Sequence, residues 1–93
     1  MLSILWNQNI NNSKFGIASK DGSTINANNI NINDSQLFDV LAYQKKSFYN
    51  GGAINIEDSK INNNKILIQN DSIAFVNKKK ISTVKFNVKE KLY

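Results

Sequence analysis

The chain has 93 residues, enough for one small domain, and 41% of them are hydrophobic, too many for a disordered chain. It contains neither cysteine nor histidine, which excludes disulfides, the usual zinc sites and histidine-dependent acid–base chemistry. Its net charge of +5 comes from lysine without arginine, the residue that clamps phosphate and reads guanine. We therefore expect no cofactor and no specific nucleic-acid partner.

The chain opens on an apolar stretch, residues 1–6, with no basic residue in it. This stretch reaches the polar Asn7 too early to complete a signal peptide or a membrane span. We expect no transmembrane segment. The localisation stays open, and the cell envelope or the extracellular space is expected if the chain is part of a longer exported protein.

Three similar segments recur along the chain, at residues 9–15, 31–37 and 55–61. Their starting positions are separated by offsets of 22 and then 24. Isoleucine alternates with asparagine at 30–32 and at 54–56, so isoleucine is expected to point inward and asparagine outward. A repeat of this length predicts an all-β fold, a right-handed parallel β-helix of three to four coils.

The repeat divides the chain into coils and stacks equivalent residues in columns. The coils are expected at roughly 4–22, 23–46, 51–69 and 70–81, with a C-terminal capping segment over 81–93. Apolar columns would fill the interior, and outward asparagine and serine would form ladders at the bends. The expected columns are Ile10, Ile32 and Ile56; Phe15, Leu37 and Ile61; and Asn12, Asp34 and Asp58.

Residues 43–52 interrupt the repeat and are expected to form a loop, with Gly51-Gly52 permitting the chain to turn back. Aromatic rings beside polar groups suit a sugar or a partner protein. Alternatively, Phe48 and Tyr49 fold down over the side of the coil while the lysines stay solvated. The candidate ligand-binding residues are Tyr43, Gln44, Lys45, Lys46, Phe48 and Tyr49.

Two aspartates, Asp34 and Asp58, share one predicted column and would lie about 5 Å apart if the coils stack. Such a pair suits a retaining glycosidase or, with Asn33 and Glu57, a calcium site. Alternatively, each carboxylate hydrogen-bonds its own backbone at a bend, the task that Asn12 performs without charge in the same column. A lyase also needs a strong base, commonly arginine, which this chain lacks.

Half of the lysines lie near the C-terminus, after a turn predicted at residues 77–80. A strand with lysine on one face is predicted to follow at 84–89. The lysines could contact an anionic glycan or lipid surface. Alternatively, they protect the open edge of the last coil against aggregation. The residues concerned are Lys78, Lys79, Lys80, Lys85, Lys89 and Lys91.

Two tracts, ASKDGS at residues 18–23 and AYQKK at 42–46, add a family resemblance to the coil pattern between about residues 10 and 76. The chain resembles bacterial right-handed parallel β-helix proteins of the pectate-lyase-like superfamily. More narrowly, it is similar to the C-terminal β-helix of proteins that also carry a spore-coat-protein-H-like kinase domain. The resemblance implies a surface or envelope accessory module without catalytic residues of its own.

The first coil has no cap in the sequence, although solenoids need polar caps at their ends. We therefore expect this coil to continue into another domain, to pair with another copy, or to keep an exposed, adhesive edge, as the C-terminal end of a β-helix would. Trp6 is expected in the core or at an interface. The favoured function is a non-catalytic structural or interaction module. A glycan-binding surface on the loop at 43–52 and a reduced polysaccharide lyase or hydrolase are the alternatives.

Overall fold

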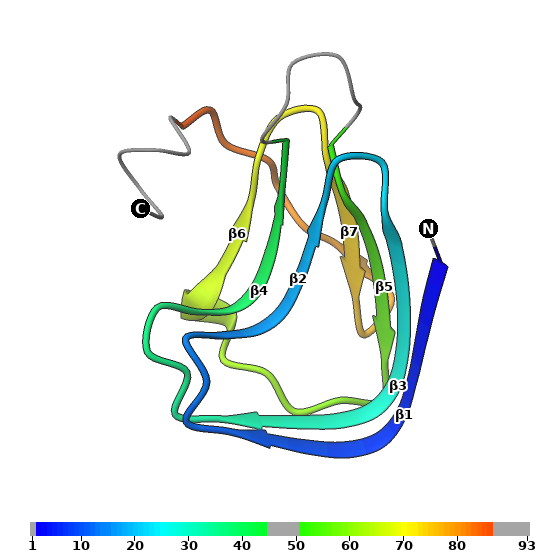
Figure 1. The fold of residues 1–93 in the computed structure, drawn as a ribbon, viewed down its shortest axis with the longest axis vertical. Coiled ribbons are helices and arrows are strands. Elements are labelled where there is room, and N and C mark those ends of the chain that lie inside the picture. The colour runs from blue at the N-terminus through cyan, green and yellow to red at the C-terminus, as the bar shows by residue number, and fades with distance from the viewer. Residues whose placement is uncertain (1, 45–50, 87–93) are drawn as a thin grey trace.

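The computed structural model describes residues 2–44 and 51–86, and within them the chain is built almost entirely of β-strands (Figure 1). Isoleucine alternates with asparagine in β3 and β5, and most of the other strands are also rich in β-branched or aromatic residues, whose side chains pack well on a pleated surface. The elements are β1 (Leu2–Asn11), β2 (Phe15–Lys20), β3 (Thr24–Asn33), β4 (Phe38–Tyr43), β5 (Ala53–Glu57), the 3₁₀ helix η1 (Asn63–Lys65), β6 (Ile66–Ile68), β7 (Ile73–Val76) and β8 (Lys79–Lys80).

The chain winds into a parallel β-solenoid of about three turns, as the sequence predicts. One sheet has the strand order β1-β3-β5-β7-β8 and the other has the order β2-β4-β6. Neighbouring strands are parallel in both sheets except for the last pair, β7 and β8. In Figure 1, β1 and β3 bend sharply in the middle. We call the part of β1 or β3 before the bend its first leg and the part after the bend its second leg. Each turn therefore has three sides. The first side is formed by the first legs with β5 and β7, the second by the second legs, and the third by the sheet β2-β4-β6.

Residues with positive φ make the corners between these sides. Asn7, Asn29 and Asp58 occupy the corner between the first and second sides, with φ of 51°, 56° and 51°. Short side chains that bond locally tolerate this conformation, which other residues adopt at a cost. The side-chain amide of Asn29 donates to Oδ1 of Asn7 at 2.7 Å and so links two turns. Asn12 and Asp34 occupy a second corner on successive turns. The consecutive residues Asp21 and Gly22 form a third corner.

The second turn is longer than the sequence alignment predicted. β1 and β3 pair Ile10 with Ile32, which confirms the first offset of 22. β3 and β5 pair Asn26 with Asn55, an offset of 29 that an isolated bridge farther along the chain repeats. The predicted alignment of Asn31 with Asn55 is therefore wrong. Asn26 and Asn31 both point outward, on opposite sides of a corner, so the alternating pattern does not tell them apart.

The interior is filled by columns that cross several turns. Leu5, Ala27, Ile56 and Val76 form one such column, and the last three are buried. The predicted columns are only partly correct, because the longer second turn moves their third members. Ile61, in place of Ile56, is the third-turn residue that follows Ile32 at the longer offset. Phe15 pairs with Phe38, while Leu37 is 40% exposed.

Gly51 and Gly52 lead into β5, and the reason for glycine there differs from the prediction. Neither has positive φ, so neither serves to reverse the chain. A Cβ atom on Gly52 would meet the backbone carbonyl of Ser19, and one on Gly51 would meet that of Asp71. Glycine is required because the backbones of adjacent turns approach each other too closely for a side chain.

The last turn ends in a hairpin in place of another corner. Asn77 and Lys78 both have positive φ, 51° and 69°, the conformation of a two-residue type I′ turn. After β7 these two residues send the chain back antiparallel along that strand. The predicted turn at 77–80 is thus shorter, since Lys79 and Lys80 form β8. The described part of the predicted cap, 81–86, continues past β6 through the bridge between Gln69 and Val84.

Candidate functional site

The first turn leaves one long strand edge without a neighbour. β1 is the end strand of its sheet, and among the described residues it pairs with β3 alone. Such an edge presents unpaired N–H and C=O groups that can accept another strand. β1 is ten residues long, and residues 2–13 include no charged side chain and no proline. Short length, lysine and proline are among the features that usually protect an edge, and β1 has none of these three.

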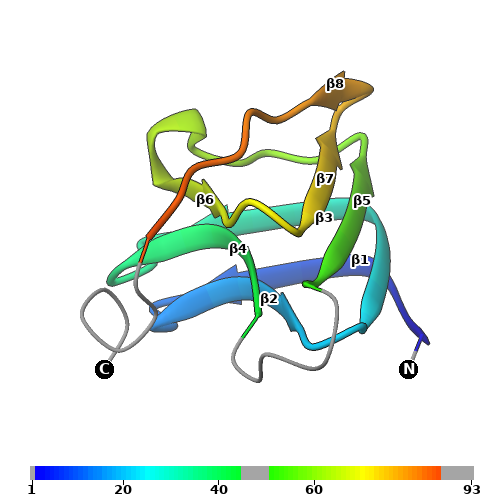
Figure 2. The same ribbon diagram turned by 90° about the horizontal axis from the view of Figure 1, so that it is seen from above.

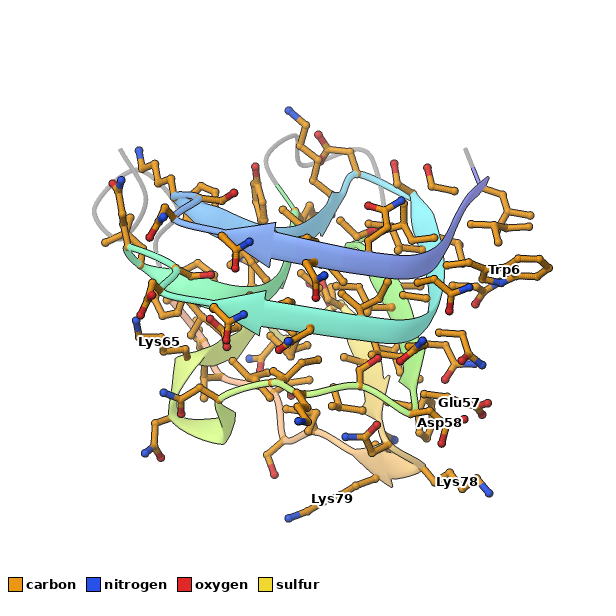
Figure 3. The ribbon with its side chains drawn as sticks, turned by 90° about the horizontal axis from the view of Figure 1, so that it is seen from below. Trp6, Glu57, Asp58, Lys65, Lys78 and Lys79 are labelled. Carbon is orange, nitrogen blue, oxygen red and sulfur yellow. The ribbon has the colours of Figure 1, made fainter. Side chains whose placement is uncertain are left out.

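The first leg of β1 also exposes apolar side chains. Leu2, Ile4 and Trp6 are 59%, 62% and 70% exposed, and we call these three residues the β1 patch. They share the outer face because side chains alternate along a strand, and Leu5 between them packs against the core. The register places Asn26 beside Ile4 on the next turn. Figure 3 shows Trp6 pointing outward at this end of the solenoid.

The opposite edge of the same sheet has the reverse character. β8 is two residues long, both residues are exposed lysines, and it runs antiparallel to β7. Lys78 in the preceding turn is exposed as well. In Figure 3, Lys78 and Lys79 lie at the end far from Trp6, and Figure 2 shows β1 and β8 on opposite sides of the stack. The sheet thus has one long neutral edge and one short cationic edge.

The binding loop predicted at 43–52 falls mostly outside the described residues. Tyr43 is 7% exposed and packs with Leu41 in a second apolar cluster, so its ring is not open to a sugar. The backbone N–H of Gln44 donates to Oε1 of Gln69. Glycan binding by this loop stays a prediction. Four of its proposed residues lie outside the described part of the chain: Lys45, Lys46, Phe48 and Tyr49.

The two aspartates of the predicted acidic pair occupy different corners. Asp34 shares its corner with Asn12, as predicted, whereas Asp58 aligns with Asn29. The prediction that Asp34 and Asp58 stack is wrong because the second turn is longer than the alignment assumed. Both have positive φ, which agrees with a role in the backbone bend. The part of the chain that the structure describes contains no group of three carboxylates able to hold a metal ion.

Two shallow hollows lie beside the corner at Asp58. Their volumes are about 430 Å³ and 310 Å³, and both are lined by Asp58 and Lys60. Two residues that line the larger hollow are hydrogen-bonded, because Oδ1 of Asn77 accepts from the backbone N–H of Ser59 at 3.0 Å. Ligand pockets are usually apolar with a few converging polar groups. These hollows are lined by amides and by charges of both signs, so they do not indicate a ligand.

Comparisons with known proteins assign the chain to no family. A scan against family models gives no match, and neither a search of curated proteins nor a search of solved structures finds a similar chain. No helix in the described residues is long and apolar enough to cross a membrane. The function must therefore be argued from the surfaces of the solenoid.

The β1 patch was only partly predicted from the sequence. The sequence predicts Trp6 in the core or at an interface but makes no prediction for Leu2 and Ile4. The signal that could have found them is the spacing of two between the three residues, which places them on one face of a strand. Leu5 concealed that signal, because an apolar residue between them makes the stretch resemble a fully buried strand.

Proposed function

We propose that this protein is a non-catalytic structural and interaction module that docks a strand of another polypeptide on the edge of β1. The observation that carries the proposal is the combination, on one strand, of an unpaired backbone edge with three exposed apolar side chains. In recognition by strand addition, backbone hydrogen bonds supply affinity and alternate side chains supply specificity. The first leg of β1 offers both.

Neither contribution suffices by itself. Fully burying a leucine or isoleucine contributes roughly 1.5–3 kcal/mol, and the side chains of the β1 patch are already partly covered. Association costs roughly 4–15 kcal/mol in lost freedom of motion. Burial of the patch therefore only begins to offset the cost of docking. The partner must also form backbone hydrogen bonds along β1, which favours a strand over a helix or a loop.

The resemblance noted in the sequence supports a more specific form of the proposal. We propose that the module belongs to a bacterial surface or envelope β-helix protein of the pectate-lyase-like kind, and that catalysis is not performed by this chain. The lack of histidine and arginine agrees with this proposal. It rests on the ASKDGS and AYQKK tracts at residues 18–23 and 42–46.

Site-specific photo-crosslinking in producing cells tests the docking proposal. A photoreactive phenylalanine analogue replaces Trp6 in one variant and Phe75 in a control variant. Phe75 is 38% exposed on the same outer face but belongs to β7, away from the edge. We expect a discrete adduct from position 6 and none of that mass from position 75. The adduct should disappear when Ile4→Lys is added, because a buried lysine without a partner is costly.

Two results would overturn the docking proposal. One is the absence of any adduct from position 6, and the other is an equal pattern of adducts from positions 6 and 75. The mass of the adduct separates a second copy of this 10.5 kDa chain from a different protein. Either mass supports docking at β1.

A further inference from the structure

We infer that the strand docked on β1 is β1 of a second copy, so that two solenoids join into a closed two-fold dimer. This inference rests on the proposed function, because it names the partner of the same edge. Three features of the described residues support it: the spacing of the β1 patch, the distribution of charge, and the different ends of the sheet.

The spacing of the β1 patch is self-complementary. If a two-fold axis passes through Ile4, antiparallel pairing places Leu2 of one copy opposite Trp6 of the other and Ile4 opposite Ile4. Directly opposed side chains lie on the same face, with Cβ atoms about 4.5–5.5 Å apart. The six apolar side chains of the two patches would then cover one another on a single continuous face. Leu5 would face Ser3 of the other copy on the inner side.

The distribution of charge favours contact at this end. Two copies each carrying a net charge of +5 repel one another, so contact is least costly where neither copy is charged. The described edge of β1 has no charged residue, whereas Lys78 and Lys79 lie at the far end (Figure 3), and Lys80 follows Lys79 in β8. In the two-fold arrangement these lysines point away from the interface. The first-turn lysines lie outside the paired leg, because Lys14 precedes β2 and Lys20 is its last residue.

The difference between the two edge strands of the sheet favours a closed dimer over an open filament. Head-to-tail stacking would set β1 against β8, which is only two residues long, cationic and antiparallel to its neighbour. Such stacking would generate an open filament, whereas a two-fold contact uses the same patch twice and leaves neither β1 patch free for a third copy. A dimer and no larger assembly is therefore expected.

Measurement of mass across a dilution series tests the inference. Light scattering coupled to size exclusion should give twice the chain mass of 10.5 kDa at high concentration. Ile4→Lys places two like charges opposite each other across the axis and should raise the dissociation constant at least about tenfold. The matched control is Phe75→Lys, since Ile4 and Phe75 belong to one outward column and Phe75 lies three strands from the edge. The control should leave the dimer unchanged.

A disulfide readout guards against loss of folding in the lysine variant. The chain has no cysteine, so Ile4→Cys introduces a single thiol. Opposed residues on the two-fold axis lie close enough for a disulfide after a small shift. Mild oxidation should convert this variant into a covalent dimer, while Phe75→Cys should react slowly. A monomer at every concentration, with equal oxidation of the two variants, would overturn the dimer. The docking proposal would still stand if position 6 crosslinks to a different protein.

Discussion

At the scale of the residue, the fold depends on a few side chains that allow unusual backbone. Eight non-glycine residues have positive φ among those described, and most of them are asparagine or aspartate at the corners. The asparagines at these positions thus have a local cause, since this residue tolerates the left-handed region. Asp39 is buried, and its Oδ2 accepts from the backbone N–H of Asn62 at 2.8 Å. This hydrogen bond fixes the chain before η1, and Asp39 itself is only 2% exposed.

Two glycines distinguish a steric requirement from a conformational one. We expect Gly52→Ala to lower the free energy of unfolding by about 1–3 kcal/mol, because its Cβ atom would meet the Ser19 carbonyl. Gly22→Asn should change that free energy by less than about 1 kcal/mol, because asparagine tolerates positive φ. Gly22 has φ of 79° and open space around its Cα. Urea denaturation of both variants measures the difference, and equal losses would contradict the steric explanation.

At the scale of the element, the edge strands β1 and β8 differ because a turn reverses the chain before β8. β8 exists because the type I′ turn at Asn77 and Lys78 reverses the chain after β7. The reversal replaces a parallel edge by a short antiparallel one made of lysine. Among the described residues, no such reversal adds a strand beside β1. One edge of the sheet is therefore closed by the backbone, and the other stays available for a partner.

The hairpin turn gives a test at this scale. Lys78 has φ of 69°, which costs a residue with a Cβ atom roughly 1 kcal/mol. Lys78→Gly should therefore raise the free energy of unfolding by up to about 1 kcal/mol, since Asn-Gly is the preferred type I′ pair. Lys79→Gly, one residue later in β8, should lower it slightly because glycine is unfavourable in a strand. Thermal melts of the two variants should shift in opposite directions.

At the scale of the whole molecule, burial grows from the first turn inward. The inner residues of β1 are at most partly buried, whereas Ile54 and Ile56 of β5 are 2% and 0% exposed. Each turn contacts only its neighbours, so a residue of the first turn is covered from one side and one of a central turn from both. The end turn therefore gains the most from a docked partner, in agreement with the proposed dimer.

Truncating one central residue measures how much the stack depends on its interior. Ile56→Ala should lower the free energy of unfolding by about 2–5 kcal/mol, because it opens a cavity between two covering turns. Ile73→Ala lies on the outer face, where Ile73 is 42% exposed, and should cost less than about 1 kcal/mol. Chemical denaturation followed by circular dichroism compares the two, and similar losses would contradict the assignment of inner and outer faces.

The sequence by itself determined the solenoid. The alternation of isoleucine with asparagine predicts strands, and the recurrence of these segments along the chain predicts the repeat. It also placed Asn12 with Asp34 and Ile10 with Ile32 correctly. Only the tertiary structure decided the longer second turn, since the alternation looks the same on either side of a corner. That register separated Asp34 from Asp58 and placed Ile61 where Ile56 was expected. The structure also decided that Leu2 and Ile4 share an exposed face with Trp6, because an apolar residue in a strand faces the core or the solvent according to which neighbours cover it.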